Sequence, residues 1–394
     1  MDLREISRQE DLIAVVQRTM QPVWSEHLGK EVRISRAPLD ARSQPWQMNQ
    51  WLGAFYSEDP AAAPRKFMAD RFRFTANWLR LPFQWAYGSY LVSRPRLRTG
   101  EVGFFVTPGL PKAPDILVVP GSRRIRTFDF SRGTTRSYLK AGYSAEATAR
   151  EIEVRATGEG PFPRIVAKSP QNTWFEEEIL SGYTLPRIPP WWNRKTLERL
   201  LLLSIAEWLA ARVQPSDAGE YISGLMSDIS EALRLFAHQY PAHAQVVNLN
   251  YIRSLEMQLN HDQVLLLSQS HGDLQPGNVH LTPGREVYFL DWEFSALRHQ
   301  NYDLLTYGLS ARWPIGLAGR VQRFVATGDL GLVTQFLEGE STREVRKRLV
   351  TLYLLEEIAR ATRACVSSPF VAPPIGYLHL WSELRQLGSL NTSG

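Results

Sequence analysis

The sequence is poor in the features that mark several protein classes. Its single cysteine, Cys365, excludes an intrachain disulfide and a metal site built from several cysteines. Lysine is scarce, with seven residues, and the net charge is only +5 because 45 basic residues face 40 acidic ones. The sequence has no dense basic run with interleaved aromatic residues, so we expect no nucleic-acid partner. Arginine supplies most of the positive charge, and its planar guanidinium suits the forked recognition of phosphate and carboxylate groups.

Long hydrophobic runs are also missing. The most apolar stretch, residues 197–213, is interrupted by four charged side chains, so it does not favour a membrane-spanning helix. The chain starts with Met1-Asp2-Leu3-Arg4-Glu5, which has acidic residues where a signal peptide would have a positive region. We therefore expect a cytoplasmic protein without a transmembrane segment. Composition gives no indication of the oligomeric state.

What is present is typical of a globular protein with a large core. Hydrophobic residues make up 44% and charged residues 22% of the 394 residues, a length that favours about two to three domains. Residues 1–113 carry mixed helical signals and many aromatic residues, and we interpret them as a mainly helical N-terminal extension. The aromatic residues either pack into a core or form a patch for a partner or a membrane surface. They include Trp46, Trp51, Phe55, Phe72, Phe74, Trp78, Phe83 and Trp85.

The pattern changes to short strands in residues 114–185 and to helices in residues 186–394. Apolar runs at 103–106, 116–119, 125–130, 136–140, 164–167 and 173–180 are separated by glycine- and proline-containing turns, which indicates a small antiparallel sheet. One helix interrupts it at 145–156, with Ser144 as a plausible N-cap. The later part is expected to be mostly helical, with two short strands at 263–267 and 286–290 that flank polar loops.

The polar loops carry the residues with the clearest chemistry. Asp273 and Asn278 are five residues apart in a loop that contains Pro276 and Gly277, and Asp291 directly follows an apolar strand. Magnesium needs hard oxygen ligands, usually one or two carboxylates together with substrate phosphates. Phosphoryl transfer also needs a carboxylate that orients and deprotonates the attacking hydroxyl group. Asp273 can be that base, while Asn278 and Asp291 hold the metal.

The order His-Gly-Asp-x4-Asn, followed thirteen residues later by Asp-Trp-Glu, resembles the aminoglycoside phosphotransferase and choline-kinase-like branch of the protein-kinase-like fold. Eukaryotic protein kinases have His-Arg-Asp and Asp-Phe-Gly at these places, so Gly272 disfavours a protein kinase. The resemblance implies an α+β, bilobal fold with a small antiparallel β lobe and a larger helical lobe. It also implies ATP as co-substrate, Mg²⁺ as cofactor and a small-molecule hydroxyl acceptor.

The same resemblance assigns roles to the upstream lobe. The turn at Gly121 and Ser122 can direct backbone N–H groups at phosphates, with Arg123 or Arg124 adding a charge, or it is a plain hairpin. Lys140, at the end of a strand, would reach the α- and β-phosphates and pair with Glu151 on the following helix, for which Glu146 and Glu153 are alternatives.

In this family the strand that joins the two lobes binds adenine through backbone groups. By the resemblance, Glu178, Ile179 and Leu180 would line the base, and Gly182 would supply flexibility. Asp303 would brace the catalytic loop, and His271 would position it rather than transfer protons.

The acceptor is the least determined feature. Residues 307–394 contain ten basic and seven acidic side chains, whereas a polycationic aminoglycoside favours an acidic pocket. The prediction is therefore a phosphotransferase for a sugar, a glycoconjugate or another neutral or anionic metabolite. An aminoglycoside phosphotransferase and a catalytically silent nucleotide-binding scaffold of the same fold remain the alternatives. The sequence does not choose between ATP and GTP.

Overall fold

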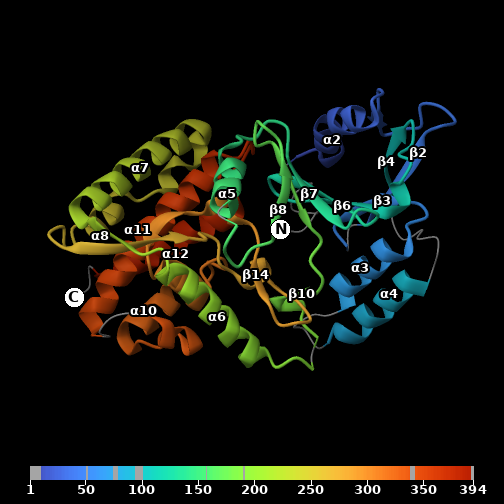
Figure 1. Ribbon diagram of the computed structural model, residues 1–394. Coiled ribbons are helices and arrows are strands. Elements are labelled where there is room, and N and C mark those ends of the chain that lie inside the picture. Colours follow the sequence, from blue (N-terminus) through green and yellow to red (C-terminus); the bar gives the residue numbers. More distant parts are fainter. Residues whose placement is uncertain are drawn as a thin grey trace. The chain divides into compact units, whose positions relative to one another are not determined.

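A computed structural model describes residues 10–49, 52–73, 79–93, 101–156, 158–189, 191–337 and 342–391 (Figure 1). The chain divides into two compact units. The first contains residues 1–193 and 280–288, and the second contains residues 194–279 and 289–394. The inclusion of residues 280–288 in the first unit is a feature that a linear division of the sequence does not anticipate.

A nine-stranded antiparallel sheet, in the order β1-β4-β2-β3-β5-β6-β7-β9-β8, forms the centre of the first unit. Three further short strands form a second sheet in the order β10-β13-β14. The strands of the large sheet are β1 (Arg33–Ser35), β2 (Gln44–Asn49), β3 (Ala54–Ser57), β4 (Glu101–Thr107), β5 (Ile116–Pro120), β6 (Arg124–Asp129), β7 (Thr134–Leu139), β8 (Ile165–Lys168) and β9 (Trp174–Glu178). Those of the small sheet are β10 (Tyr183–Thr184), β13 (Val279–Leu281) and β14 (Val287–Phe289).

The strands and the helix expected between residues 114 and 185 are confirmed. Strands β5, β6 and β7 form consecutive hairpins, and β9 pairs with β7 in an antiparallel register. The helix α5 (Glu146–Ala156) follows Ser144, whose hydroxyl accepts a hydrogen bond from the backbone N–H of Glu146 at 3.3 Å. The short-range alternation of apolar residues and turn residues therefore predicts this part of the sheet correctly.

The first 113 residues are not a separate extension. They contain the helices α2 (Leu12–Leu28), α3 (Ala62–Arg73) and α4 (Leu81–Ser93), but also strands β1 to β4, which continue the same sheet. Strand β3 pairs directly with β5, so residues on both sides of position 113 share one set of backbone hydrogen bonds. The sequence analysis expected only one of these strands, β4.

The aromatic residues of this region differ in their burial. Trp46 and Phe104 are fully buried and stack with ring centroids 5.7 Å apart in the core beneath α2. Phe83 and Trp85, in contrast, are 60% and 57% exposed on α4, which packs against α3 (Figure 1). Trp51, Phe74 and Trp78 lie outside the described residues.

The second unit is mainly helical. Its helices are α6 (Arg194–Ala210), α7 (Ala218–Gln239), α8 (Leu249–Glu256), α9 (Tyr302–Gly308), α10 (Leu317–Thr327), α11 (Arg343–Val366) and α12 (Ile375–Asn391), and its strands β11 (Gln214–Asp217), β12 (Val264–Ser270) and β15 (Ala296–His299) form one sheet. The largest apolar core lies around α11, which packs against α7, α8 and α10. No helix within the described ranges is long and apolar enough to cross a membrane.

Candidate functional site

The loop that follows β12 turns sharply at Gly272. This residue has φ +81°, a left-handed backbone conformation in which side chains are strained. A Cβ atom added there would lie 2.0 Å from the carbonyl oxygen of Phe294 and 2.7 Å from Nη1 of Arg298. Only glycine fits this position, which explains in physical terms why a Gly stands before Asp273.

Asp303 holds the start of the loop. Its carboxylate accepts two backbone hydrogen bonds, from the N–H of His271 at 2.5 Å and from the N–H of Gly272 at 2.9 Å. Asp303 lies in the first turn of α9 and is fully buried. Charge-assisted bonds of this kind are among the stronger hydrogen bonds in proteins. Asp303 is thus a brace for the loop, as the resemblance implies.

His271 joins the loop to the end of β14. Its Nε2 lies 2.8 Å from the carbonyl oxygen of Leu290, and its Nδ1 accepts the backbone N–H of Asp273 at 3.2 Å. The Nε2–H tautomer satisfies both bonds. The ring is fully buried against Trp292, with the centroids 4.6 Å apart. His271 therefore positions Asp273.

The Asp273 carboxylate lies at the centre of a set of polar contacts. Its Oδ2 accepts hydrogen bonds from Nδ2 of Asn278 at 2.8 Å and from Nε2 of Gln275 at 3.0 Å. Its Oδ1 forms an ion pair with Nε of Arg312 at 2.5 Å. The structure thus brings Asp273 and Asn278 together, as the sequence predicts. It adds Arg312, which lies far along the chain and which the sequence analysis did not identify.

Asp291 is placed beside this loop by the backbone of Leu290. The N–H of Leu290 donates to the carbonyl oxygen of Asn278 at 2.8 Å, so the end of β14 is attached to the end of the loop. Asp291 follows with φ 64° and ψ 60°, a left-handed conformation that is uncommon outside glycine. Such strained positions concentrate at functional sites. Asp273, Asn278 and Asp291 therefore belong to one local assembly.

The oxygen donors of this assembly are of the kind that magnesium prefers. Within the residues that the structure describes, no three His, Cys, Asp or Glu side chains are grouped to hold a metal. The hydrogen bonds of Asn278 to Asp273 use its amide nitrogen, which leaves the amide Oδ1 as an oxygen ligand. Magnesium is commonly bound through one or two carboxylates and substrate phosphates, so Asn278 and Asp291 are suitable ligands.

Arg312 is held in its charged form by a buried network. Its Nη1 pairs with Glu357 at 2.6 Å, and its Nη2 donates to the carbonyl oxygen of Gly272 at 2.6 Å. Burial opposes the charge, but Glu357 and, more weakly, Asp273 raise the pKa of Arg312 well above its usual value. Glu357 is also bound by Arg360 at 2.7 Å. The network fixes a permanent positive charge next to Asp273.

Glu356, the neighbour of Glu357 on α11, is a buried acid with a different environment. Its Oε1 accepts hydrogen bonds from the hydroxyl of Tyr221 at 2.5 Å and from the N–H of His299 at 2.7 Å. Its Oε2 is buried without a hydrogen-bond partner among the described residues. Burial outweighs these bonds and raises the pKa of Glu356 to about 7. The folded protein therefore binds the proton of Glu356 more tightly than the unfolded chain does.

A pH dependence of stability follows from Glu356. Because its folded pKa of about 7 lies above the ordinary value of 4.5, its stabilising contribution is complete below pH 4.5 and is lost as the pH rises through 7. A shift of this size corresponds to about 3 kcal/mol. We expect the free energy of unfolding of wild type to fall relative to Glu356→Gln between pH 5 and 8 in urea titrations. A difference between the two proteins that stays constant over this range would contradict the assignment.

In the first unit, Lys140 and Glu151 do not form the expected pair. Lys140 is buried, and its Nζ contacts the carboxylate of Glu10 and the carbonyl oxygen of Ser122, the latter at 3.0 Å. Burial lowers the pKa of Lys140, and Glu10 partly offsets this. Glu151 is instead paired with Arg124 from β6. The reason is strand geometry: Arg124 lies opposite Leu139 in the register, so the following residue, Lys140, points to the other face of the sheet.

Arg124 and Glu151 belong to a buried chain of charges. Glu151 also pairs with Arg155 at 2.9 Å, and Arg155 pairs with Glu177 on β9 at 2.5 Å. Burial alone would raise the pKa of Glu151, but Arg124 and Arg155 outweigh it and lower the pKa to about 2. The guanidinium groups of Arg124 and Arg155 lie 5.3 and 5.0 Å from the ring centre of Phe175. This arrangement links β6, α5 and β9.

The turn between β5 and β6 is closed by its own hydrogen bonds. The N–H of Gly121 donates to the carbonyl oxygen of Arg124 at 2.7 Å, so this donor is used within the hairpin. The carbonyl oxygen of Ser122 accepts from Lys140 and from the hydroxyl of Tyr143 at 3.1 Å. In this structure the Gly121 N–H is therefore bonded within the hairpin, and Arg124 is paired with Glu151.

The segment expected to bind adenine has one backbone donor already in use. The N–H of Ile179 donates to the carbonyl oxygen of Gly133 at 2.9 Å, while Glu178 and Ile179 line an open recess of about 580 Å³. Leu180 follows them without a regular element. Gly182 has φ +115°, and a Cβ there would lie 2.0 Å from the carbonyl oxygen of Leu281. Gly182 is thus required for close packing of β10 on β13.

Comparisons with known proteins give fold-level likeness only. The sequence matches no protein-family model and no curated protein. Among solved structures, the chain is similar to an ethanolamine kinase from Plasmodium vivax (12% identity, 84% of this chain and 96% of that chain, TM-score 0.45). It is also similar to a choline/ethanolamine kinase family protein from Mesorhizobium loti (11% identity, 71% and 89%, TM-score 0.43).

A third similar structure is an aminoglycoside phosphotransferase from Streptomyces rimosus in complex with ADP and streptomycin (15% identity, 62% of this chain and 92% of that chain, TM-score 0.35). These are the families that the sequence motifs resemble. At such identities and TM-scores the likeness carries no argument about activity.

Proposed function

We propose that this protein is an ATP- and Mg²⁺-dependent phosphotransferase that moves the γ-phosphate to a hydroxyl group of a small molecule. The observation that carries the proposal is the assembly of Asp273, Asn278 and Asp291 around one rigid loop. Oδ2 of Asp273 lies 2.8 Å from Nδ2 of Asn278. Asp291 follows Leu290, whose backbone N–H donates to the carbonyl oxygen of Asn278 in the same loop. Phosphoryl transfer depends mainly on positioning and charge stabilisation, and a braced loop supplies positioning.

In the proposed reaction, the acceptor hydroxyl oxygen forms a bond to the γ-phosphorus while the bond from that phosphorus to the β–γ bridging oxygen breaks. The hydroxyl proton moves to the carboxylate of Asp273, and the released ADP keeps the bridging oxygen. Asn278 and Asp291 would hold Mg²⁺, which neutralises charge on the phosphates when it is bound. Arg312 and Asn278 keep the Asp273 carboxylate in a fixed orientation through the contacts described above.

The proposal also includes a nucleotide-binding set in the first unit. Gly121, Ser122, Lys140, Glu151, Glu178, Ile179 and Leu180 remain the proposed nucleotide-binding set. Because Glu151 pairs with Arg124, we add Arg124 as the cation that works with Glu151. For the acceptor, the excess of basic residues in 307–394 supports a neutral or anionic metabolite, such as a sugar or glycoconjugate, over a polycationic aminoglycoside.

A catalytically silent nucleotide-binding scaffold is the second candidate, and one observation favours it. Both carboxylate oxygens of Asp273 are engaged, Oδ1 by Arg312 and Oδ2 by Asn278 and Gln275. Lys140 is likewise engaged by Glu10. A scaffold needs these contacts to persist, whereas a kinase needs Asp273 to accept a hydroxyl group in place of one of them. Turnover in the presence of an acceptor therefore separates the two candidates.

The metal role of Asp291 predicts the behaviour of Asp291→Ala. We expect the affinity for ATP in the presence of Mg²⁺, measured by isothermal titration calorimetry, to fall by at least about 10–100-fold, the range seen even for outer-shell partners of metal ligands. In EDTA, the variant and wild type should bind ATP alike. Asp262→Ala, which removes an exposed carboxylate from the same unit, is the matched control. Unchanged Mg²⁺-dependent affinity in Asp291→Ala would remove the metal role.

A further inference from the structure

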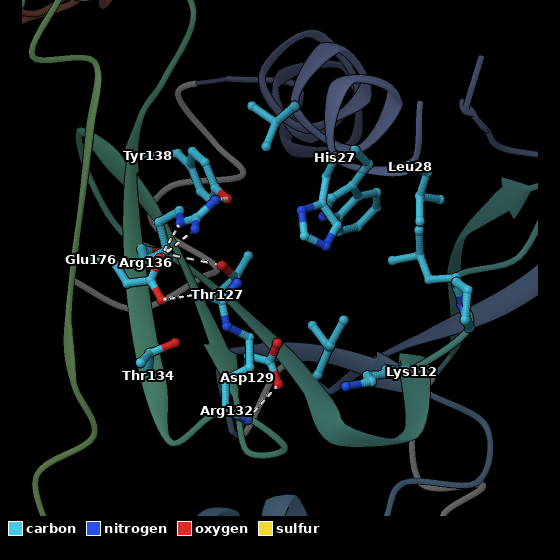
Figure 2. Close-up of a pocket in the computed structure, with 15 residues that line it drawn as sticks. His27, Leu28, Lys112, Thr127, Asp129, Arg132, Thr134, Arg136, Tyr138 and Glu176 are labelled. Atoms are coloured by element: carbon cyan, nitrogen blue, oxygen red, sulfur yellow. Dashed lines mark hydrogen bonds and ion pairs between the residues drawn. The ribbon is translucent and has the colours of Figure 1, made fainter. Parts of the chain in front are cut away.

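We propose that a cavity in the first unit, between α2 and the sheet, binds a small organic anion built on one or two rings. The cavity contains none of the residues of the 271–278 loop, so the inference does not depend on the proposed roles of Asp273 and Asn278. Arg132, Thr134 and Glu176 line both this cavity and the recess at Glu178 and Ile179. Figure 2 shows the side chains that surround it, with His27 and Leu28 from α2 on one side and residues of the sheet on the other.

The apolar wall of the cavity is suited to a ring. It is formed by Val23, Trp24, Leu28, Leu110 and Ile116, and the enclosed volume is about 220 Å³. A dry apolar cavity of about 150 Å³ is sufficient for benzene. The space between α2 and the strands therefore accommodates a single ring with a substituent or a small fused pair of rings.

The opposite wall consists of charged side chains from the sheet, most of which form ion pairs with one another. Nε of Arg136 on β7 donates to Glu176 on β9 at 2.9 Å, and Arg132 pairs with Glu176 at 3.2 Å. Glu176 is buried, and the hydroxyl of Tyr138 accepts from Arg136 at 3.3 Å. One carboxylate thus stands between two guanidinium groups, which leaves this wall with an excess of positive charge.

The remaining charged side chains of the cavity, Asp129 and Lys112, are of opposite sign and leave that excess unchanged. The carboxylate of Asp129 accepts hydrogen bonds from the backbone N–H groups of Ser131 and Arg132 and from the Ser131 hydroxyl. Its hydrogen-bond partners thus lie within the turn. Lys112 is exposed at the rim, with its Nζ 3.3 Å from the Ser131 hydroxyl, and Figure 2 shows it across the space from His27. Three cationic side chains therefore face two carboxylates. A ligand with an anionic group near Lys112 and a ring near Trp24 complements both features.

The cavity lies on the face of the sheet opposite α5. Thr127 and Asp129 line it from β6, whereas Arg124, on the same strand but of opposite parity, pairs with Glu151 of α5. Ligand binding in the cavity thus uses a different set of side chains from the Arg124–Glu151 pair. This separation makes the cavity a second site rather than a part of the charged chain that links β6, α5 and β9.

The proposal is tested by calorimetric titration of the full chain with 1-naphthoate and with its neutral counterpart 1-naphthamide. We expect 1-naphthoate to bind about tenfold more tightly than 1-naphthamide, because a charged hydrogen bond is worth more than a neutral one. Lys112→Gln should reduce the affinity for 1-naphthoate to that for 1-naphthamide. Val23→Phe should lower the affinity for both ligands, because the larger side chain fills part of the cavity. Lys30→Gln and Val102→Phe change exposed residues outside the lining and should bind like wild type.

Three results would overturn the proposal. They are no binding of 1-naphthoate to wild type, equal affinity of wild type for the two ligands, or equal losses of 1-naphthoate affinity in Lys112→Gln and Lys30→Gln. Thermal unfolding of each variant shows whether it is folded. Should Val23→Phe fail to fold, the comparison of Lys112→Gln with Lys30→Gln decides the outcome, because both replaced lysines are exposed.

Discussion

Asp273→Asn is expected to lose most of its turnover while it still binds ATP. The substitution keeps the shape of the side chain but removes the proton acceptor, and general base catalysis typically contributes about 10²–10⁴-fold to the rate. The brace from Asp303 and the contacts of His271 do not involve the Asp273 carboxylate, so the loop should keep its conformation. The proposed nucleotide-binding residues are unchanged.

The experiment compares steady-state turnover with ATP affinity in the same preparation of Asp273→Asn. A fall in turnover without a fall in affinity is the expected pattern. The loss of the ion pair with Arg312 is a side effect, and Arg312 retains Glu357 as a partner. Wild-type turnover in Asp273→Asn would contradict the base role, and a parallel loss of ATP affinity would assign Asp273 to binding.

Gly272→Ala is expected to have the largest effect on stability. The added methyl group would lie 2.0 Å from the carbonyl oxygen of Phe294, and an alanine at φ +81° is itself strained. The left-handed conformation and the overpacking together cost about 2–5 kcal/mol. Because Gly272 donates to Asp303, the loop should also shift and turnover should fall with stability.

Gly277→Ala is the matched control for Gly272→Ala. Gly277 lies in the same loop, and a Cβ atom there meets nothing within 4 Å. Its free energy of unfolding, measured in urea, should stay within about 0.5 kcal/mol of wild type. Equal stabilities of the two variants would show that the close approach of Gly272 to Phe294 is not a feature of the protein in solution.

The 271–278 loop could be predicted from the sequence because its geometry is local. Asp273 and Asn278 are five residues apart, and the strand before Asp291 is short and apolar, so their placement depends on few distant contacts. Arg312 contacts this loop from a distant part of the chain, and Glu357, on α11, contacts Arg312. No spacing rule indicates which arginine of a helical region will reach a given loop, and this part of the site was therefore missed.

The upstream lobe shows the other limit of sequence reasoning. The order of strand, lysine, helix and glutamate is present, but the pairing of Lys140 with Glu151 depends on which face of the sheet each side chain occupies. A shift of one residue reverses the face, and the register places Arg124 rather than Lys140 beside α5. Strands β1 to β3 were also missed. Strands β1 and β3 are only three and four residues long and pair with the more distant β4 and β5, whereas β2 also pairs with its chain neighbour β3.

The most direct test of the phosphotransferase proposal is Mg²⁺-dependent ATP consumption by wild type across a panel of hydroxyl acceptors, from neutral sugars and anionic metabolites to aminoglycosides, with Asp273→Ala in parallel. We predict that at least one neutral or anionic acceptor stimulates consumption, that EDTA abolishes it and that Asp273→Ala lacks it. Identical behaviour of wild type and Asp273→Ala across the whole panel would contradict the proposal and favour the silent scaffold.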